Sequence, residues 1–320
     1  MTPQSPPRSA FRDAADVLLV FLAGLVLLSV IVVLALRTDA GIRLDRDVVA
    51  SFEVDEFRPG RISALLQEIR IPTMLLLTLI AMLVVLARRL WRVALALPLL
   101  VIGANQTTQL LKLRFLTDMP SDPAVRVSMP SGHSTAAISL AAVAIIAAPR
   151  ILRPLVCLLS GAIAGGAGLG TMAERWHKPA DVIAAVGVVL IWAAVATLIG
   201  ARWVEPPQVR PAGLDRTVGH SALAVLGVAA GAFVLHRLGM GPVPGARAAT
   251  LVYASLIVVG LTIGLGLGLI AVLADRRLWR LPRAVAEPVP AVVTGPHTTT
   301  TPHTATGPHP TTRPHTEGET

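Results

Sequence analysis

The chain has 320 residues, of which 53% are hydrophobic and only 15% are charged, and its mean hydropathy is +0.68. Soluble domains carry about 25% charged residues, so this composition excludes an ordinary soluble protein and favours an integral membrane protein. The formal net charge of +9 does not indicate nucleic-acid binding, because the basic residues stand in short clusters between apolar runs. The single cysteine, Cys157, excludes an intrachain disulfide.

Eight apolar segments are long enough to cross a bilayer, which takes roughly 20 residues each. Lipid offers no partner to an unpaired backbone group, so each segment is predicted to be a helix. The first is predicted to be an uncleaved helix, because it is long for a secretory signal. The predicted fold class is an all-α, polytopic membrane helical bundle, with helices at 16–36, 72–88, 93–111, 133–149, 152–171, 180–200, 217–236 and 248–273.

Clusters of arginine predict the orientation of these helices. They lie between the second and third segments, the fourth and fifth, the sixth and seventh, and after the eighth. The positive-inside rule places these clusters and both termini in the cytoplasm, which predicts a multi-pass protein of the plasma membrane. The clusters contain Arg88, Arg89, Arg92, Arg150, Arg153, Arg202, Arg210, Arg216, Arg276, Arg277, Arg280 and Arg283.

The long loop after the first segment carries apolar residues that we expect to lie along the membrane surface. They are Val48, Val49, Phe52, Leu65, Leu66 and Ile69. Small residues also recur on two segments at a spacing that lets membrane helices approach closely, which we interpret as packing without a catalytic role. These residues are Gly161, Gly165, Gly166 and Gly170 on the fifth segment and Gly260, Gly264 and Gly268 on the eighth.

The composition predicts two regions, an eight-helix transmembrane domain at 1–283 and a disordered tail at 284–320. The tail is rich in Pro and Thr and has no apolar run that could form a core. Its evenly spaced histidines are compatible with transition-metal binding, but a plain solvated tail is the favoured interpretation. These histidines are His297, His303, His309 and His315.

The run Pro130-Ser131-Gly132-His133, directly before the fourth segment, has the features of an anion site. Free backbone N–H groups and the positive end of the helix dipole would face a ligand there, and glycine permits close approach. Ser131 has a simpler alternative role as the N-cap of the helix. That alternative does not account for His133, a titratable group at the membrane boundary.

The run His177-Lys178-Pro179-Ala180-Asp181 leads into the sixth segment. If a helix begins near Lys178, His177 and Asp181 lie about one turn apart. A carboxylate that accepts a hydrogen bond from one imidazole nitrogen leaves the other nitrogen free as a nucleophile or base. The alternative is a loop histidine followed by an aspartate that interacts only with the helix dipole.

Together with Lys112 at the end of the third segment, these runs resemble the type 2 phosphatidic acid phosphatase superfamily, which includes vanadium-dependent haloperoxidases. The family pattern is Lys-x6-Arg-Pro, then Pro-Ser-Gly-His, then Ser-Arg-x5-His-x3-Asp. The resemblance covers roughly residues 60–200 and implies a six-helix core followed by two additional helices. The matching residues are Lys112-x6-Met119-Pro120, Pro130-Ser131-Gly132-His133 and Gly170-Thr171-x5-His177-x3-Asp181.

The resemblance implies a role for each of these residues. His177 would attack phosphorus to form a phosphohistidine, Asp181 would orient His177, and His133 would protonate the leaving oxygen. No metal or other cofactor is expected, since no metal-ligand cluster is visible near these runs. The phosphoryl oxygens would be held by Lys112, Ser131 and Gly132.

The two phosphate-holding arginines of the family are missing, because Met119 and Thr171 stand at their positions. Arg114 would point away from Lys112 on a continuing helix, and Arg126 has no predictable place. Arg175 is the best replacement, since on a continuing helix it shares a face with Thr171. An arginine that only contacts lipid headgroups is an equally good interpretation of Arg175.

Polar residues on the third segment share a helical face with Lys112 by their spacing, namely Asn105 and Gln109. They are expected either to brace Lys112 or to form interhelical hydrogen bonds without function.

The expected function is a membrane phosphatase that acts on a lipid phosphate or diphosphate, of the phosphatidate or polyprenyl kind. Its partners would be membrane lipid and the lipid phosphate, with no nucleic acid. A catalytically impaired protein that binds a lipid phosphate or a partner is the alternative, motivated by the missing arginines. Phosphoryl transfer to an acceptor other than water is a third reading of the same residues.

Overall fold

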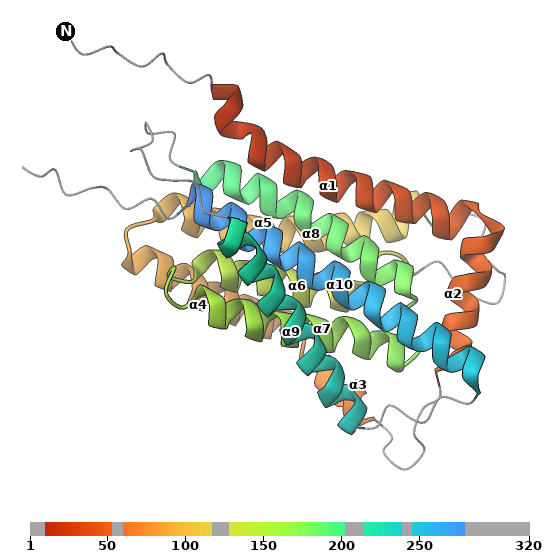
Figure 1. Ribbon diagram of the computed structural model, residues 1–320. Coiled ribbons are helices and arrows are strands. Elements are labelled where there is room, and N and C mark those ends of the chain that lie inside the picture. The colour runs from red at the N-terminus through yellow and green to blue at the C-terminus, as the bar shows by residue number, and fades with distance from the viewer. Residues whose placement is uncertain (1–9, 53–59, 117–127, 202–213, 239–244, 279–320) are drawn as a thin grey trace, which may run out of the picture. The chain divides into compact units, whose positions relative to one another are not determined.

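The computed structural model describes residues 10–52, 60–116, 128–201, 214–238 and 245–278 (Figure 1). These residues form a helical bundle and contain no strand, which confirms the predicted fold class. The helices are α1 (Ala10–Arg37), α2 (Asp39–Ser51), α3 (Arg61–Gln67), α4 (Ile71–Ala87), α5 (Trp91–Leu110), a short π-helix η1 (Leu111–Phe115), α6 (Gly132–Ala147), α7 (Arg153–Ala173), α8 (Pro179–Gly200), α9 (Leu214–Leu238) and α10 (Ala246–Arg277).

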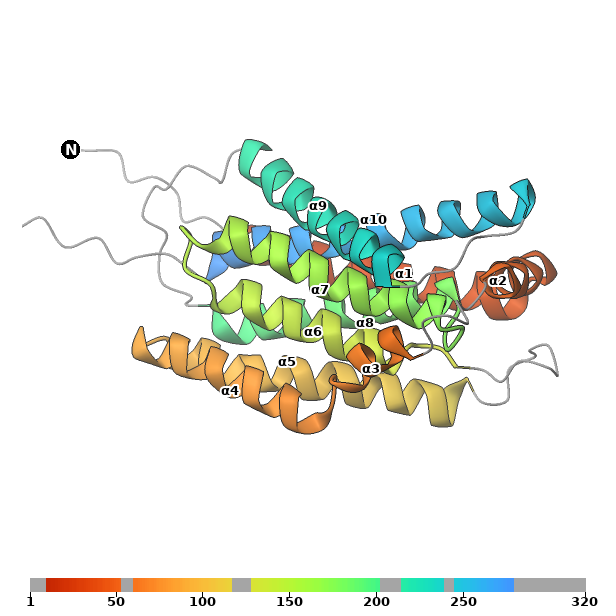
Figure 2. The same cartoon turned by 90° about the horizontal axis from the view of Figure 1, so that it is seen from below.

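Each of the eight predicted segments corresponds to a helix, but these helices differ in how well they match a membrane span. Among the described residues, six helices are long and apolar enough to cross a bilayer. A seventh span is possible if α3 and α4, which meet at a bend of 57°, are taken together. The apolar helix α6 has only 16 residues, and it is buried almost throughout between its neighbours (Figure 2). Helix α6 is therefore enclosed largely by other helices, as is most of the longer α8.

Helix α1 packs closely against α8. A Cβ added to Gly24 would lie 2.8 Å from the backbone oxygen of Gly187, and one added to Gly187 would lie 2.9 Å from that of Gly24. Glycine on both sides lets the two backbones touch, as in other closely packed membrane helices. This contact holds α1 against α8, the helix that begins at the His177–Asp181 run.

The predicted small-residue stripes on α7 and α10 both face α9. A Cβ added to Gly161 would lie 2.1 Å from the Ala224 oxygen, and one added to Gly264 would lie 2.5 Å from a Val225 methyl carbon. The successive contacts of α7 with α9 advance together along both chains, so these helices run parallel, while α10 runs antiparallel to α9. The expectation that these glycines permit close packing is confirmed for all of them except Gly166, whose Cβ would meet nothing within 4 Å among the described residues.

A buried polar cluster joins the start of α7 and the start of α9 to the end of α10. The Arg153 side chain is 0% exposed and binds Asp275 through Nη1. It also donates to the carbonyl oxygens of Ile145 (3.2 Å) and Ala148 (2.8 Å). The exposed Arg150 donates to the backbone oxygen of Asp275 at 2.9 Å, and His220 Nδ1 lies 3.7 Å from Asp275 Oδ2. Asp275 therefore attaches the last helix to the bundle.

The apolar residues of the 37–70 segment do not all lie where the sequence suggested. Val48, Phe52 and Leu66 are buried in the hydrophobic core, whereas Leu65 is exposed. A Cβ on Gly170 of α7 would lie 3.6 Å from a Leu66 methyl carbon, which shows that α3 covers the end of α7. The expectation of a membrane-surface position is wrong for the three buried residues, because α2 and α3 pack on the bundle.

Candidate active site

The predicted histidine–aspartate pair lies at the entry to α8, with His177 just before the helix and Asp181 in its first turn. His177 Nδ1 donates to Asp181 Oδ2 at 3.0 Å, and the Lys178 N–H donates to the same oxygen at 3.2 Å. Ser128 Oγ donates to it as well. Asp181 is 0% exposed and His177 is 9% exposed. Because Nδ1 is engaged by the carboxylate, the Nε2 atom of His177 is the one that remains for chemistry.

The turn between α7 and α8 differs from the continuing helix that was expected at Arg175. Helix α7 ends at Ala173, and the N–H groups of Trp176 and His177 both donate to the Thr171 oxygen, at 2.9 and 3.1 Å. Arg175 has φ 58° and an exposed side chain. The argument that Arg175 shares a helical face with Thr171 is therefore wrong.

Thr171, which occupies a family arginine position, is fully buried, and its hydroxyl donates to the Gly168 oxygen at 2.7 Å. It has no capacity to take over the charge of the missing arginine. The other substituted position, Met119, lies outside the described residues, as do Pro120 and Arg126.

Ser131 is the N-cap of α6, which is the alternative role left open by the sequence. Its Oγ accepts the Ser134 N–H at 3.3 Å, and its own N–H donates to the Asp181 backbone oxygen at 3.0 Å. Ser131 is fully buried. The Ser131–Asp181 hydrogen bond joins the start of α6 directly to the start of α8.

Gly132 and His133 occupy the first positions of α6, where a helix has no internal acceptor for its N–H groups. Within the described part of the chain, no hydrogen bond uses these two N–H groups. A Cβ on Gly132 would meet only Gln109 Nε2, at 3.6 Å. Among the described residues, little therefore crowds Gly132, which is compatible with the anion-site hypothesis.

His133 packs against Trp176, with ring centroids 5.5 Å apart and an angle of 48° between the rings. It interacts electrostatically with both His177 and Lys112. Trp176 was not singled out from the sequence, although its place directly before His177 marked it as a neighbour of the site. The structure thus brings the two histidines to the same end of the bundle from α6 and from the α7–α8 turn.

Lys112 lies in η1, where the helix widens after α5. It is partly buried and interacts electrostatically with Asp181. A single π-turn within a longer helix is frequent at functional sites. The π-helix also changes the spacing of side chains around the axis, so the α-helical spacing that was used to place Arg114 does not apply there. The Arg114 side chain is exposed.

Behind Lys112, polar side chains join α5 to α6. Asn105 donates to the Val101 oxygen at 2.8 Å and to Ser139 Oγ at 3.4 Å, and the hydroxyls of Thr108 and Thr135 lie 2.9 Å apart. For Asn105 this supports the interpretation as an interhelical hydrogen bond.

Asp45 on α2 is a carboxylate near the site that the sequence analysis missed. Its Oδ1 accepts the N–H of Ala180 in the first turn of α8 at 3.5 Å, and Oδ2 has no hydrogen-bond partner among the described residues. The side chain is only 6% exposed. Burial raises the pKa of Asp45 to about 6, against the opposing charge of Lys178. The signal was its spacing with Val48 and Phe52, which puts a carboxylate on the apolar face of α2.

Asp45→Asn is expected to flatten the pH dependence of stability. A pKa raised from 3.8 to about 6 in the folded state stabilises the protein at acid pH, and this stability is lost as the pH rises through 6. Between pH 4 and pH 8 the wild-type protein should lose up to about 3 kcal/mol relative to the variant, at about 1.4 kcal/mol per pKa unit.

Thermal unfolding in detergent at several pH values measures this difference. Asp47→Asn, a half-exposed carboxylate on the same helix, is the control. Parallel pH profiles for the wild type and Asp45→Asn would contradict the prediction.

The described residues contain no group of three or more His, Cys, Asp or Glu side chains that could hold a metal ion. The tail histidines lie outside them.

The bundle and its site define a class: a helical membrane protein with a histidine–aspartate pair, a second histidine and a lysine at one end of the helices. A family model, that of the PAP2 superfamily, matches residues 23–205. The match covers more than half of the chain, so this protein belongs to the PAP2 superfamily, which generally comprises phosphoesterases. Neither the comparison with curated proteins nor that with solved structures found a match.

The match begins within α1, well before the residue-60 start expected for the core. It therefore contains six of the predicted membrane helices, α1 and α4 to α8. The close contact of Gly24 with Gly187 explains why α1 belongs with this core.

Proposed function

We propose that this protein is a phosphatase of the plasma membrane that hydrolyses a lipid phosphate or diphosphate through a phosphohistidine on His177. The observation that carries the proposal is the hydrogen bond from His177 Nδ1 to the buried Asp181, which leaves Nε2 available. Covalent catalysis of this kind divides one difficult displacement into two easier ones.

In the first step His177 Nε2 forms a bond to phosphorus while the bond from phosphorus to the leaving oxygen breaks. His133 gives its proton to that oxygen, which departs as a lipid alcohol or, from a diphosphate, as a lipid monophosphate. In the second step water attacks the phosphohistidine, His133 takes the proton of the water, and the phosphorus–nitrogen bond breaks to release phosphate.

The charge of the transferred phosphoryl group needs fixed donors. In this proposal Lys112 and the N–H groups of Gly132 and His133 supply them, while Ser131 holds the start of α6 in place. The burial of Asp181 and the partial burial of Lys112 support this, because charges interact more strongly away from water.

Arg175 is proposed as a substrate-binding residue at the rim of the site. Arg175→Ala should lower kcat/KM for a lipid phosphate by about a hundredfold or more, the usual effect of losing a charged transition-state donor. The exposed Arg114 offers a control, since Arg114→Ala should leave kcat/KM unchanged. Full activity of Arg175→Ala would assign Arg175 to headgroup contact alone.

The proposed orientation puts both termini in the cytoplasm and the site outside it. The basic residues Arg150, Arg153 and Arg276 at the other end of the bundle support this arrangement through the positive-inside rule. A lipid substrate would then reach the site from the outer leaflet.

The most direct test is phosphate release by the purified protein from a panel of lipid phosphates and diphosphates. Analysis of the organic product separates hydrolysis from transfer to another acceptor, because only transfer forms a new phosphate ester.

Binding of a lipid phosphate without turnover is the second candidate function, and the buried, internally bonded Thr171 favours it. Loss of a charged transition-state donor costs about a hundredfold or more in rate. Lipid phosphates that bind without releasing phosphate would establish this alternative.

A further inference from the structure

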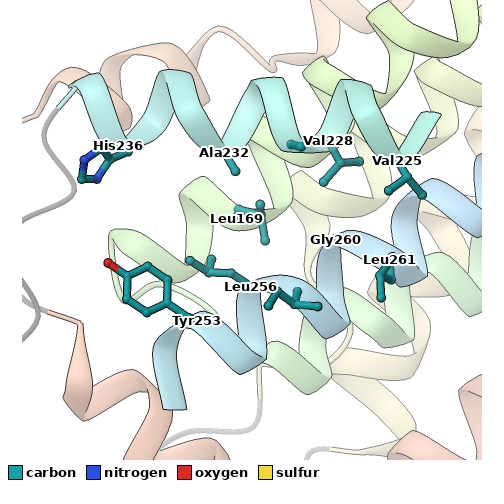
Figure 3. Close-up of a pocket in the computed structure, with 11 residues that line it drawn as sticks. Leu169, Val225, Val228, Ala232, His236, Tyr253, Leu256, Gly260 and Leu261 are labelled. Atoms are coloured by element: carbon teal, nitrogen blue, oxygen red, sulfur yellow. The ribbon is translucent and has the colours of Figure 1, made fainter. Parts of the chain in front are cut away.

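Helices α9 and α10, which follow the family match, form an open pocket together with α7. Its volume of about 460 Å³ falls within the range of about 300–1,000 Å³ of sites that hold small molecules. Figure 3 shows side chains of α7, α9 and α10 around it. We call it the α7–α9–α10 groove, and its walls include Leu169, Val228, Ala232, Leu256 and Gly260.

The groove opens where the close contacts between the helices end. Near the middle of α9, a Cβ on Gly264 would lie 2.5 Å from a Val225 methyl carbon, so α9 and α10 touch there. Beyond this contact the two helices separate toward the end of α9 and the beginning of α10 (Figures 1 and 2). The hollow is therefore built by the crossing of two helices.

The lining changes in polarity along the groove. His236 and Tyr253 lie at one end, and the rest of the lining is apolar (Figure 3). Both polar residues are exposed, and Tyr253 is 52% exposed. A phenol and an imidazole each present an apolar ring and a hydrogen-bond donor, as at a membrane interface. The matching ligand has a hydrocarbon chain and, at one end, a hydrogen-bond acceptor.

The position of the groove identifies the source of such a ligand. Its apolar part lies between helices long and apolar enough to cross a bilayer. Its polar end lies at the same end of the bundle as His177, because α7 and α9 run parallel and α7 leads into the His177 turn. A bilayer offers acyl chains at this depth and phosphate groups at its boundary.

The groove is separate from the candidate active site. A Cβ on Gly168 would lie 3.0 Å from Ile263 of α10 and from Val182 of α8, and 3.9 Å from Ser134 Oγ of α6, so this face of α7 is turned toward the interior of the bundle. The next residue, Leu169, lines the groove on another face of the same helix. A lipid bound in the groove would therefore be distinct from the substrate at His177.

We propose that the α7–α9–α10 groove binds one acyl chain of a membrane phospholipid, whose phosphate accepts hydrogen bonds from Tyr253 and His236. This site is independent of the phosphatase reaction proposed above.

The sequence offers a specific probe, since Tyr253 is the only tyrosine of the chain. Protein labelled with 3-fluorotyrosine gives one ¹⁹F resonance, observed in maltoside micelles, which contain no phospholipid. The added probe is phosphatidylglycerol with a nitroxide on one acyl chain. We expect the resonance to broaden to saturation as this lipid is added and to recover with unlabelled phosphatidylglycerol.

Two matched variants distinguish the groove from ordinary lipid contact. Ala232 lines the groove, whereas Ala230 on the same helix is exposed and does not line it. Ala232→Phe should fill the groove and abolish the saturable broadening, while Ala230→Phe should retain it. A chain-labelled diacylglycerol, which lacks the phosphate, should bind at least tenfold more weakly than the labelled phosphatidylglycerol.

If the broadening in the wild-type protein rises in proportion to the labelled lipid without saturating, that result alone would overturn the proposal. Equal broadening in Ala232→Phe and Ala230→Phe would do the same. Equal binding of the diacylglycerol would overturn the assignment of the phosphate to Tyr253 and His236.

Discussion

His177→Ala should lower phosphate release from lipid phosphates by about a thousandfold or more, because removal of a covalent nucleophile leaves only binding and electrostatic stabilisation. The fold should persist, since His177 ends a turn whose backbone hydrogen bonds to Thr171 do not use the side chain. Phosphate release in detergent, with elution volume on size exclusion as the check of folding, measures the effect. Activity that survives the substitution would reject the mechanism.

The covalent intermediate gives this prediction a second readout. Wild-type protein mixed with a ³²P-labelled substrate and quenched in alkali should retain the label as phosphohistidine, and His177→Ala should not. Asp181→Asn keeps the size of the side chain but removes the charge that orients His177, so it should label more slowly without losing label altogether.

His133→Ala separates the two steps. With a substrate such as p-nitrophenyl phosphate, whose leaving group needs no proton, the first step should proceed while attack by water is slowed. Label should then accumulate above the wild-type amount. The absence of accumulation would argue against a role of His133 as the base for water.

Local patterns in the sequence predicted the parts of the molecule that depend on nearby residues. Each membrane helix carries its own apolar signal, because every span must independently satisfy its backbone in lipid. The pairing of His177 with Asp181 was predictable because it also depends only on nearby residues. The two lie four positions apart, which is about one helical turn.

Features that depend on distant segments were missed or misplaced. Asp45 approaches the start of α8 from a separate helix, 135 residues earlier in the chain, and no local pattern specifies that contact. The expected helical position of Arg175 failed because the backbone turns back on Thr171 and places a residue other than glycine at positive φ. Val48, Phe52 and Leu66 were assigned to a lipid surface, because an apolar face alone does not reveal whether protein or lipid covers it.

Asp275→Ala is expected to destabilise the protein by about 3–5 kcal/mol, the usual effect of removing one partner from a buried ion pair. Arg153 is 0% exposed and would keep its hydrogen bonds to the Ile145 and Ala148 oxygens but lose its carboxylate partner. A buried guanidinium that loses its carboxylate pays the full desolvation penalty. Thermal unfolding in detergent should show a clearly lower Tm.

Arg276→Ala is the matched control at the neighbouring position. Arg276 lies 3.6 Å from Asp16, and both side chains are partly exposed, at 37% and 28%. Exposed pairs of this kind contribute about 0–1 kcal/mol, so this variant should unfold near the wild-type temperature. Equal Tm values for Asp275→Ala and Arg276→Ala would contradict the role given to the buried pair.

The double variant Arg153→Met/Asp275→Leu distinguishes charge from packing. If the loss in Asp275→Ala comes from an unpaired buried charge, apolar side chains in both positions should recover most of the stability. If it comes from lost contacts between α7 and α10, the double variant should remain unstable. Recovery is the expected result, because the glycine contacts of α9 with both helices lie outside the Arg153–Asp275 pair and still hold the three helices together.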